Sequence, residues 1–150
     1  MSRIALFPGS FDPFTRGHED IVRRGLYLFE EIIIGVGHNS RKNRYVPIEK
    51  MLGHIQDTFD DESRVQVITY DELTAELAKK YRVRYLLRGL RNTTDFEYEN
   101  SISQINRYLN EELETVFLIT SPPYAHINSS IIREVHRYGG SVEAFLPYKL

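Results

Sequence analysis

The sequence contains no cysteine, so it can form neither disulfide bonds nor thiolate metal sites. No apolar run approaches the roughly 20 residues that a membrane-spanning helix needs. The first apolar run begins at Ile4 and is interrupted by Pro8 and Gly9, which does not match the layout of a signal peptide. We therefore expect a cytoplasmic protein without a membrane partner.

An excess of charge of one sign is also missing. The chain has 19 basic and 21 acidic residues, so no broad basic surface is expected to attract nucleic acid. Its length of 150 residues and its 41% hydrophobic content are typical of one globular domain, which we expect to span residues 1–150. His38, His54 and His136 have no partner at the spacing of metal ligands, and we expect them on the surface.

Strand-like and helix-like segments alternate along the chain. Short apolar runs that are typical of buried strands occupy residues 4–7, 32–36, 65–68, 85–87 and 116–119. Helix-like patterns lie between or after these runs. One begins at Pro47, the next has Asp71 as its predicted N-cap, and two more cover about 94–109 and about 129–137. This order predicts an α/β fold with a doubly wound, five-stranded, mostly parallel, Rossmann-like sheet and helices on both faces.

The most informative segment follows the first predicted strand. Residues 7–18 form a loop rich in glycine and proline, which carries the hydroxyl of Ser10 and delivers His18 to the first turn of the next helix. The N-terminus of a helix presents unpaired N–H groups and a partial positive charge, so phosphate is the expected ligand. Open parallel sheets bind ligands where their strands end, which favours this loop as a binding site.

The fourth predicted strand ends in two arginines. Arg88 and Arg91 are spaced to converge on one anion, and guanidinium groups suit phosphate oxygens bidentately. Arg91, Asp95 and Glu99 are also spaced four apart on a helix, so an exposed ladder of salt bridges is the alternative. The position at a strand end favours the anion site.

The fifth predicted strand leads to Asn128, Ser129 and Ser130 at the start of the last helix. These residues offer hydroxyls and backbone N–H groups to a phosphate, although N-capping alone is the alternative for any one of them. The crevice of a doubly wound sheet often opens between its first and fourth strands. We therefore expect the three strand ends to face one polyphosphate site.

These segments resemble the phosphopantetheine adenylyltransferases, which belong to the nucleotidyltransferases with a T/H-x-G-H motif. The resemblance extends from the first strand to about Pro147, and it is carried by residues 9–13, 15–18, 88–91, 95–99 and 127–130. It implies transfer of an adenylyl group from ATP to 4′-phosphopantetheine, which yields dephospho-coenzyme A and pyrophosphate. It also implies Mg²⁺ bound with ATP, coenzyme A as a further ligand, and a homohexamer.

The resemblance further implies a role for individual residues. His18 would be catalytic and would donate a hydrogen bond to the α-phosphate. The acceptor would be bound by Ser10, Lys42, Thr74 and Arg88. The ATP site would contain Ser10, Phe11, His18, Gly89, Leu90, Arg91, Glu99, Tyr124, Ala125, His126, Ile127, Asn128, Ser129 and Ser130. The protein would supply no metal ligand of its own, because ATP oxygens and water would hold the Mg²⁺.

The implied reaction makes modest chemical demands. The acceptor is already a phosphate anion, so alignment of two anions and neutralisation of charge suffice without a nucleophilic side chain. The alternatives are a nicotinamide-mononucleotide adenylyltransferase, a cytidylyltransferase and a non-catalytic nucleotide sensor. A dinucleotide-binding module is disfavoured, because Gly35 and Gly37 are not followed by the third glycine of G-x-G-x-x-G.

Overall fold

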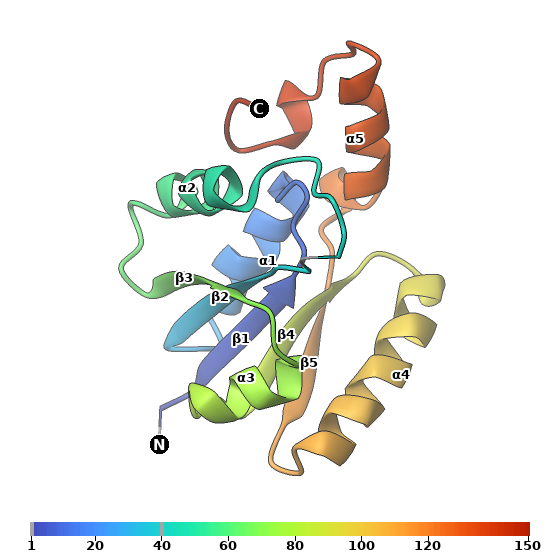
Figure 1. Cartoon of the computed structure of the whole chain (residues 1–150). Helices are drawn as coiled ribbons and strands as arrows, with labels where there is room; N and C mark the ends of the chain where they lie inside the picture. The colour runs from blue at the N-terminus through green and yellow to red at the C-terminus, as the bar shows by residue number, and fades with distance from the viewer. Residues whose placement is uncertain (1, 40) are drawn as a thin grey trace.

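The computed structural model describes residues 2–39 and 41–150. Within them, one sheet contains the strands β1 (Ile4–Gly9), β2 (Glu31–Gly37), β3 (Val65–Tyr70), β4 (Tyr85–Leu90) and β5 (Glu114–Ile119). Their order is β3-β2-β1-β4-β5, and every neighbouring pair is parallel (Figure 1). This confirms the predicted doubly wound sheet. The direction of winding switches between β1 and β4, where such sheets bind ligands.

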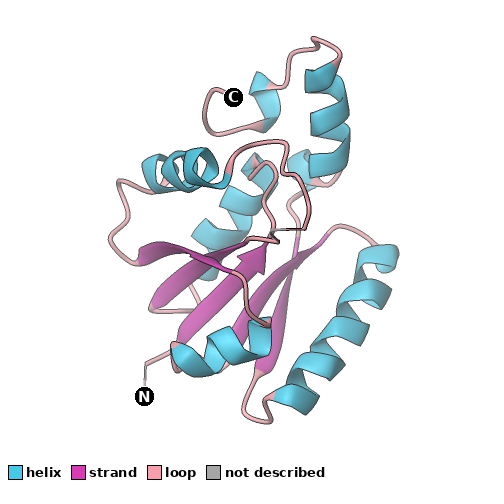
Figure 2. Ribbon diagram, in the orientation of Figure 1, coloured by secondary structure: helices cyan, strands magenta, loops and turns pink. Residues whose placement is uncertain are grey.

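Helices cover both faces of the sheet (Figure 2). They are α1 (Arg16–Gly25), α2 (Ile48–Thr58), α3 (Thr74–Lys80), α4 (Thr93–Leu109) and α5 (Ser129–Arg137), with short 3₁₀ turns at Pro122–Tyr124 and Glu143–Phe145. One face carries α1 and α2, and the other carries α3 and α4. Helix α5 and the C-terminal tail lie beyond the carboxyl ends of the strands (Figure 1).

Strand β2 shows why the sheet needs helices on both sides. Ile32 and Ile34 join the apolar cluster under α1 and α2, whereas Ile33 joins the cluster under α3. Successive side chains of a strand point to opposite faces, so an uninterrupted apolar run is buried only if both faces are covered. The uninterrupted apolar run at 32–36 is therefore explained by the position of β2 inside the sheet, where both of its faces are covered.

The start of α3 differs from the prediction. Asp71 directly follows β3, and the helix begins at Thr74 with Leu73 at the cap position and no side-chain cap. The predicted N-cap was therefore wrong, because the chain bends at Glu72 and the helix begins only at Thr74. Strand β4 is also longer than predicted and reaches Leu90, so Arg88 lies within the strand.

Two of the three histidines predicted on the surface are partly buried. The His54 ring stacks on Tyr148 with 4.3 Å between the ring centroids, and its Nε2 is buried without a hydrogen-bond partner in the described structure. His136 places Nδ1 2.5 Å from the Tyr45 hydroxyl. Of the three, His38 alone is exposed as expected. Among residues 2–39 and 41–150, no helix combines the length and apolar character that crossing a membrane requires.

Two helical glycines provide a test of the packing between α1 and the sheet. A Cβ at Gly25 would lie 2.7 Å from Leu87 Cδ2 and 2.9 Å from Ile32 Cδ1, and both side chains are fully buried. We expect Gly25→Ala to lower the free energy of unfolding by about 1–3 kcal/mol, because the core must shift to admit the methyl group.

Gly53 in the middle of α2 is the matched control, since nothing lies within 4 Å of its added Cβ. Gly53→Ala should raise the free energy of unfolding by about 0.5–1 kcal/mol through helix propensity and chain entropy. Urea unfolding of both variants measures the two changes. A rise in stability for Gly25→Ala would show that α1 packs less closely than described.

Candidate active site

The loop between β1 and α1 is built around a phenylalanine that folds back beneath it. Phe11 has a positive φ of 46°, a conformation that is uncommon for a bulky residue. Its ring is buried, and it would contact a Cβ at Gly9 at 2.8 Å, so glycine is required at that position. Phe11 was predicted to contact ATP; its side chain packs into the core, so its backbone is the part of the residue that this prediction concerns.

Two oppositely charged residues, Arg44 outside this loop and Asp12 within it, tie the loop to the segment before α2. Arg44 donates to the Ser10 carbonyl at 2.7 Å and to the Phe11 carbonyl at 2.9 Å. The Asp12 carboxylate accepts from the backbone N–H groups of Tyr45 and Val46 at 2.9 and 2.8 Å. Sequence reasoning missed both roles, because Arg44 belongs to a basic segment that resembles a solvated loop.

His18 is held by the first turn of α1. Thr15 caps the helix, and its backbone N–H donates to His18 Nδ1 at 2.9 Å. A backbone N–H can only donate, so Nδ1 is unprotonated and the neutral ring carries its proton on Nε2. Burial, followed by the positive charges of Arg88 and Arg91, lowers the pKa of His18 to about 3. His18 is therefore a neutral hydrogen-bond donor at physiological pH.

Arg88 is paired with a buried carboxylate on α4. Its Nε and Nη2 donate to the two oxygens of Glu99 at 3.0 and 2.6 Å, and Nη1 donates to the Pro8 carbonyl on β1. The Glu99 side chain is 8% exposed, so its charge depends on this partner. Glu99 was predicted in nucleotide binding, and its contact in the structure is with Arg88.

Arg91 forms the second ion pair at this strand end. Its Nε and Nη2 donate to Asp95 at 2.9 and 3.0 Å, and Nη1 donates to the Ile127 carbonyl at 3.2 Å. These hydrogen bonds lower the pKa of Asp95 and keep it ionised. Arg91 and Asp95 thus form an i,i+4 ion pair, as the ladder alternative predicted, but Arg91 precedes α4 and both side chains are only partly exposed; Glu99 pairs with Arg88 instead.

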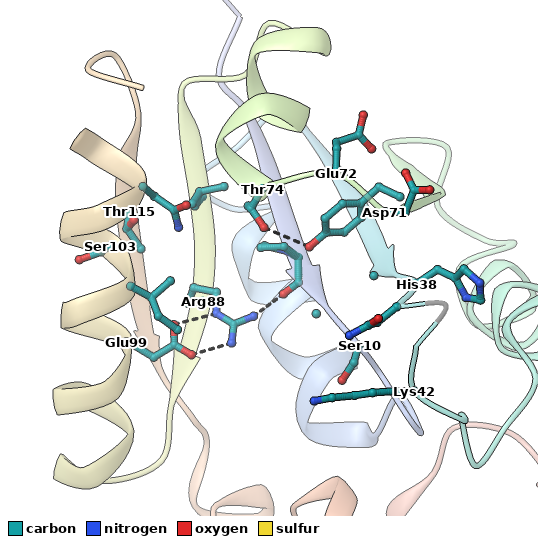
Figure 3. Close-up of a pocket in the computed structure, with 18 of the residues that line it drawn as sticks. Ser10, His38, Lys42, Asp71, Glu72, Thr74, Arg88, Glu99, Ser103 and Thr115 are labelled. Atoms are coloured by element: carbon teal, nitrogen blue, oxygen red, sulfur yellow. Dashed lines mark hydrogen bonds and ion pairs between the residues drawn. The ribbon is translucent and has the colours of Figure 1, made fainter. Parts of the chain in front are cut away.

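Two cavities adjoin at the carboxyl ends of β1 and β4. The Lys42 cavity, of about 740 Å³, is lined by all four residues predicted to bind the acceptor, Ser10, Lys42, Thr74 and Arg88. Figure 3 shows Arg88 between Glu99 on α4 and Ser10 on the loop, with Lys42 beyond Ser10. The Thr74 hydroxyl lies 3.1 Å from the Tyr70 hydroxyl in this cavity.

The His18 cavity, of about 680 Å³, contains most of the predicted ATP-binding residues. They are Ser10, His18, Gly89, Arg91, Glu99, Tyr124, Ile127, Asn128, Ser129 and Ser130. Leu90, Ala125 and His126 do not line it, and His126 is exposed with its ring edge-on to Phe145. Ser10, Arg88 and Glu99 line both cavities, so His18 and the two arginines share one site.

The polar residues at the start of α5 were predicted either to cap the helix or to bind phosphate, and the structure is compatible with both roles. Asn128 caps the helix by accepting from the Ile131 N–H at 2.8 Å. Ser129 donates to the Pro13 carbonyl at 2.8 Å, which joins α5 to the β1–α1 loop. Asn128 therefore acts as the N-cap, and it lines the His18 cavity together with Ser129 and Ser130.

Several wall residues were not predicted from the sequence. One face of α4 adds Ile102, Ser103 and Asn106 to the Lys42 cavity. They follow Glu99 at helical spacing, so periodicity from Glu99 was the signal that could have identified them. Within residues 2–39 and 41–150, no group of three or more histidine, aspartate or glutamate side chains could hold a metal ion.

Comparison with known proteins places this geometry in a family. The cytidylyltransferase-like family model matches residues 6–135. Over 150 residues the chain is 59% identical to the phosphopantetheine adenylyltransferase of Cytophaga hutchinsonii, and the match covers 100% of both chains. The chain belongs to the phosphopantetheine adenylyltransferase family. The family assignment confirms the predicted nucleotidyltransferase and does not favour the alternative transferases or a sensor.

A second relative supports the phosphopantetheine adenylyltransferase assignment, and a solved structure shares the fold of the chain. The enzyme of that name from Flavobacterium johnsoniae is 50% identical over 97% of this chain and 95% of its own. A bifunctional NMN adenylyltransferase/ADP ribose pyrophosphatase from Francisella tularensis has a TM-score of 0.76 at 15% identity. That match covers 99% of this chain and 46% of the larger protein, and it confirms the fold alone.

The lowered pKa of His18 predicts that its ring stays neutral in mild acid. We expect the ¹⁵N chemical shifts of its imidazole to remain constant from pH 8 to pH 5, with Nε2 protonated throughout, because the pKa is about 3. NMR of ¹⁵N-histidine-labelled protein checks this, with free histidine in the sample as the reference. A titration midpoint above pH 5.5 would contradict the electrostatic account.

Proposed function

We propose that this chain transfers the adenylyl group of ATP to 4′-phosphopantetheine, with dephospho-coenzyme A and pyrophosphate as products. The observation that carries this proposal is the junction of the two cavities, where Ser10, Arg88 and Glu99 line both walls. An acceptor in the Lys42 cavity and ATP in the His18 cavity would meet at this junction. Bringing two anions together in line is the main task of such a catalyst.

The chemistry proceeds without proton transfer. An oxygen of the acceptor phosphate attacks the α-phosphorus of ATP, and the bond from that phosphorus to the pyrophosphate oxygen breaks. Pyrophosphate leaves with the electron pair of the broken bond. Lys42 and Arg88 line the cavity for the acceptor and offset its charge. His18 donates from Nε2–H to an α-phosphate oxygen, where negative charge builds in the transition state.

A neutral histidine suits this role because it donates without needing to lose or gain a proton. Arg88 and Arg91 supply the positive field, and each is already oriented by a carboxylate. Ser129 and Ser130, at the N-terminus of α5, line the same cavity, where the triphosphate would lie. These donors are fixed before the substrates arrive, which lowers the cost of reorganisation.

Mg²⁺ fits this site as a partner of ATP. Glu99 and Asp95, the carboxylates beside the proposed triphosphate position, are both engaged by arginines. The triphosphate oxygens and water would therefore hold the ion, which supplies further charge neutralisation. We also place the protein in the cytoplasm and expect dephospho-coenzyme A and coenzyme A as its other ligands, without a nucleic-acid or membrane partner.

We further propose that copies of the chain assemble into a homohexamer. Helix α4 exposes a row of apolar side chains at helical spacing, with Tyr98, Ile102, Ile105 and Tyr108 at 67%, 37%, 60% and 83% exposure. A contiguous apolar surface of this kind is typical of contacts between protein chains. A second copy is the occupant that the family resemblance favours.

The enzyme assay separates this function from its alternatives. Purified protein with Mg²⁺ and ATP should release pyrophosphate when 4′-phosphopantetheine is added, and not when nicotinamide mononucleotide replaces it. His18→Ala should lower kcat by about 10²–10³-fold while the Kd for ATP changes less than threefold, because the lost contact strengthens mainly in the transition state. Equal losses in kcat and in ATP affinity would contradict this role for His18.

Arg88 and Arg91 form a matched pair for testing how the two cavities are used. Arg88→Ala should raise the Kd for phosphopantetheine by about 10–100-fold through loss of charge-assisted hydrogen bonds. Arg91 lines the His18 cavity and not the Lys42 cavity. Arg91→Ala should therefore weaken ATP binding more than acceptor binding. Isothermal titration calorimetry measures both affinities.

Removal of Arg88 also leaves Glu99 without its partner, so a control is needed. The double variant Arg88→Ala, Glu99→Ala removes the unpaired buried charge and should keep the weak acceptor binding. Recovery of normal acceptor affinity in the double variant would show that Arg88 serves the fold and not the ligand.

A further inference from the structure

The C-terminal tail reaches the loop that holds His18 through a single side chain. The hydroxyl of Tyr148 donates to the Phe14 carbonyl at 2.5 Å. That carbonyl belongs to the same peptide unit as the N–H of Thr15, which donates to His18 Nδ1 at 2.9 Å. The tail and the imidazole are therefore joined by one planar peptide group, with a hydrogen bond at each end.

We propose that Tyr148 is a positioning residue, which acts through the Phe14–Thr15 peptide to hold His18 in its Nε2–H tautomer and in its working orientation. The catalytic consequence of this inference rests on the proposed role of His18. The sequence gives no local sign of the link, since Tyr148 lies 134 positions from Phe14.

The peptide group can transmit this effect for two reasons. It is rigid and planar, so fixing its carbonyl also fixes the direction of its N–H. A hydrogen bond accepted by the carbonyl also polarises the amide and strengthens its N–H as a donor, as in other chains of hydrogen bonds. Phe14 and Thr15 are both buried, so water does not readily replace a lost partner here.

Tyr148 is itself held in a defined position. Its ring lies parallel to His54, with an angle of 9° between the planes, and its hydroxyl also lies 3.5 Å from Met51 Sδ. Burial, with a further contribution from the negative charge of Asp12, raises the pKa of the Tyr148 hydroxyl. The hydroxyl therefore stays protonated and remains a donor to the carbonyl.

A purely structural role is the alternative to positioning. Tyr148 and Leu150 pack both on the main core and on the cluster beneath α5, so the tail also contributes to stability. A structural role would change the stability of the protein without changing the hydrogen bonds of the imidazole. The two explanations are separated by observing His18 directly.

Tyr148→Phe is the decisive variant, because it keeps the ring and its stacking on His54 and removes only the hydroxyl. In the unmodified protein we expect one His18 tautomer by ¹⁵N NMR and a scalar coupling between Thr15 N and His18 Nδ1 across their hydrogen bond. In the variant we expect this coupling to weaken and the Nδ1–H tautomer to appear. With ATP and phosphopantetheine, kcat should fall about fivefold and both KM values should change less than twofold.

Two control variants isolate the hydroxyl. Leu150→Ala trims the packing of the same tail and should lower Tm with the His18 spectrum and kcat unchanged. Tyr138→Phe removes a hydroxyl from a residue that is 82% exposed, and it should change neither measurement. An unchanged His18 spectrum in Tyr148→Phe, or the same spectral change in Leu150→Ala, would overturn the proposal.

The experiment also distinguishes this inference from the proposed function. If the unmodified protein transfers no adenylyl group, the proposed function fails, while the His18 spectrum still shows whether Tyr148 positions the ring. If activity is normal and the coupling between Thr15 and His18 is absent in the unmodified protein, the positioning inference alone fails.

Discussion

The ion pair between Arg88 and Glu99 is the contact on which both halves of the site depend. It lies at the point where the winding of the sheet reverses, and it joins β4 to α4 while Arg88 also binds the Pro8 carbonyl on β1. Glu99 is buried, and an unpaired carboxylate there would be strongly unfavourable. The pair therefore fixes one guanidinium at the junction of the two cavities.

Burial, followed by the positive charges of Arg88 and Arg91, determines the protonation state of His18. Its pKa is lowered, so the unfolded chain binds a proton more readily than the folded chain between pH 6.5 and about pH 3. This contribution to stability is present above the unfolded pKa and is lost as the pH falls through that interval. The lowered pKa of Asp95 acts in the same direction at lower pH. The buried imidazole near these two arginines is therefore neutral, and it lowers the stability of the fold only in acid.

Local patterns were a good guide to elements and to the residues at strand ends. Apolar runs located the five strands, and the strand-end rule brought Ser10, His18, Arg88 and Arg91 into one region before any geometry was known. The rule does not specify which way a loop side chain turns, so it gave no sign that the Phe11 ring packs into the core. Arg44 was missed, because the carbonyl groups that it binds are more than 30 positions away in the chain.

The sequence by itself determined the parallel α/β fold and the family, because hydrophobic periodicity, glycine placement and the motifs around His18 and Arg88 are local properties. The tertiary structure alone decided which partners the charged groups take. Glu99 pairs with Arg88 and not along its helix, and Tyr148 reaches the peptide beside His18 from the far end of the chain. Such pairings depend on which surfaces the crossovers bring together, and no pattern within one segment contains that information.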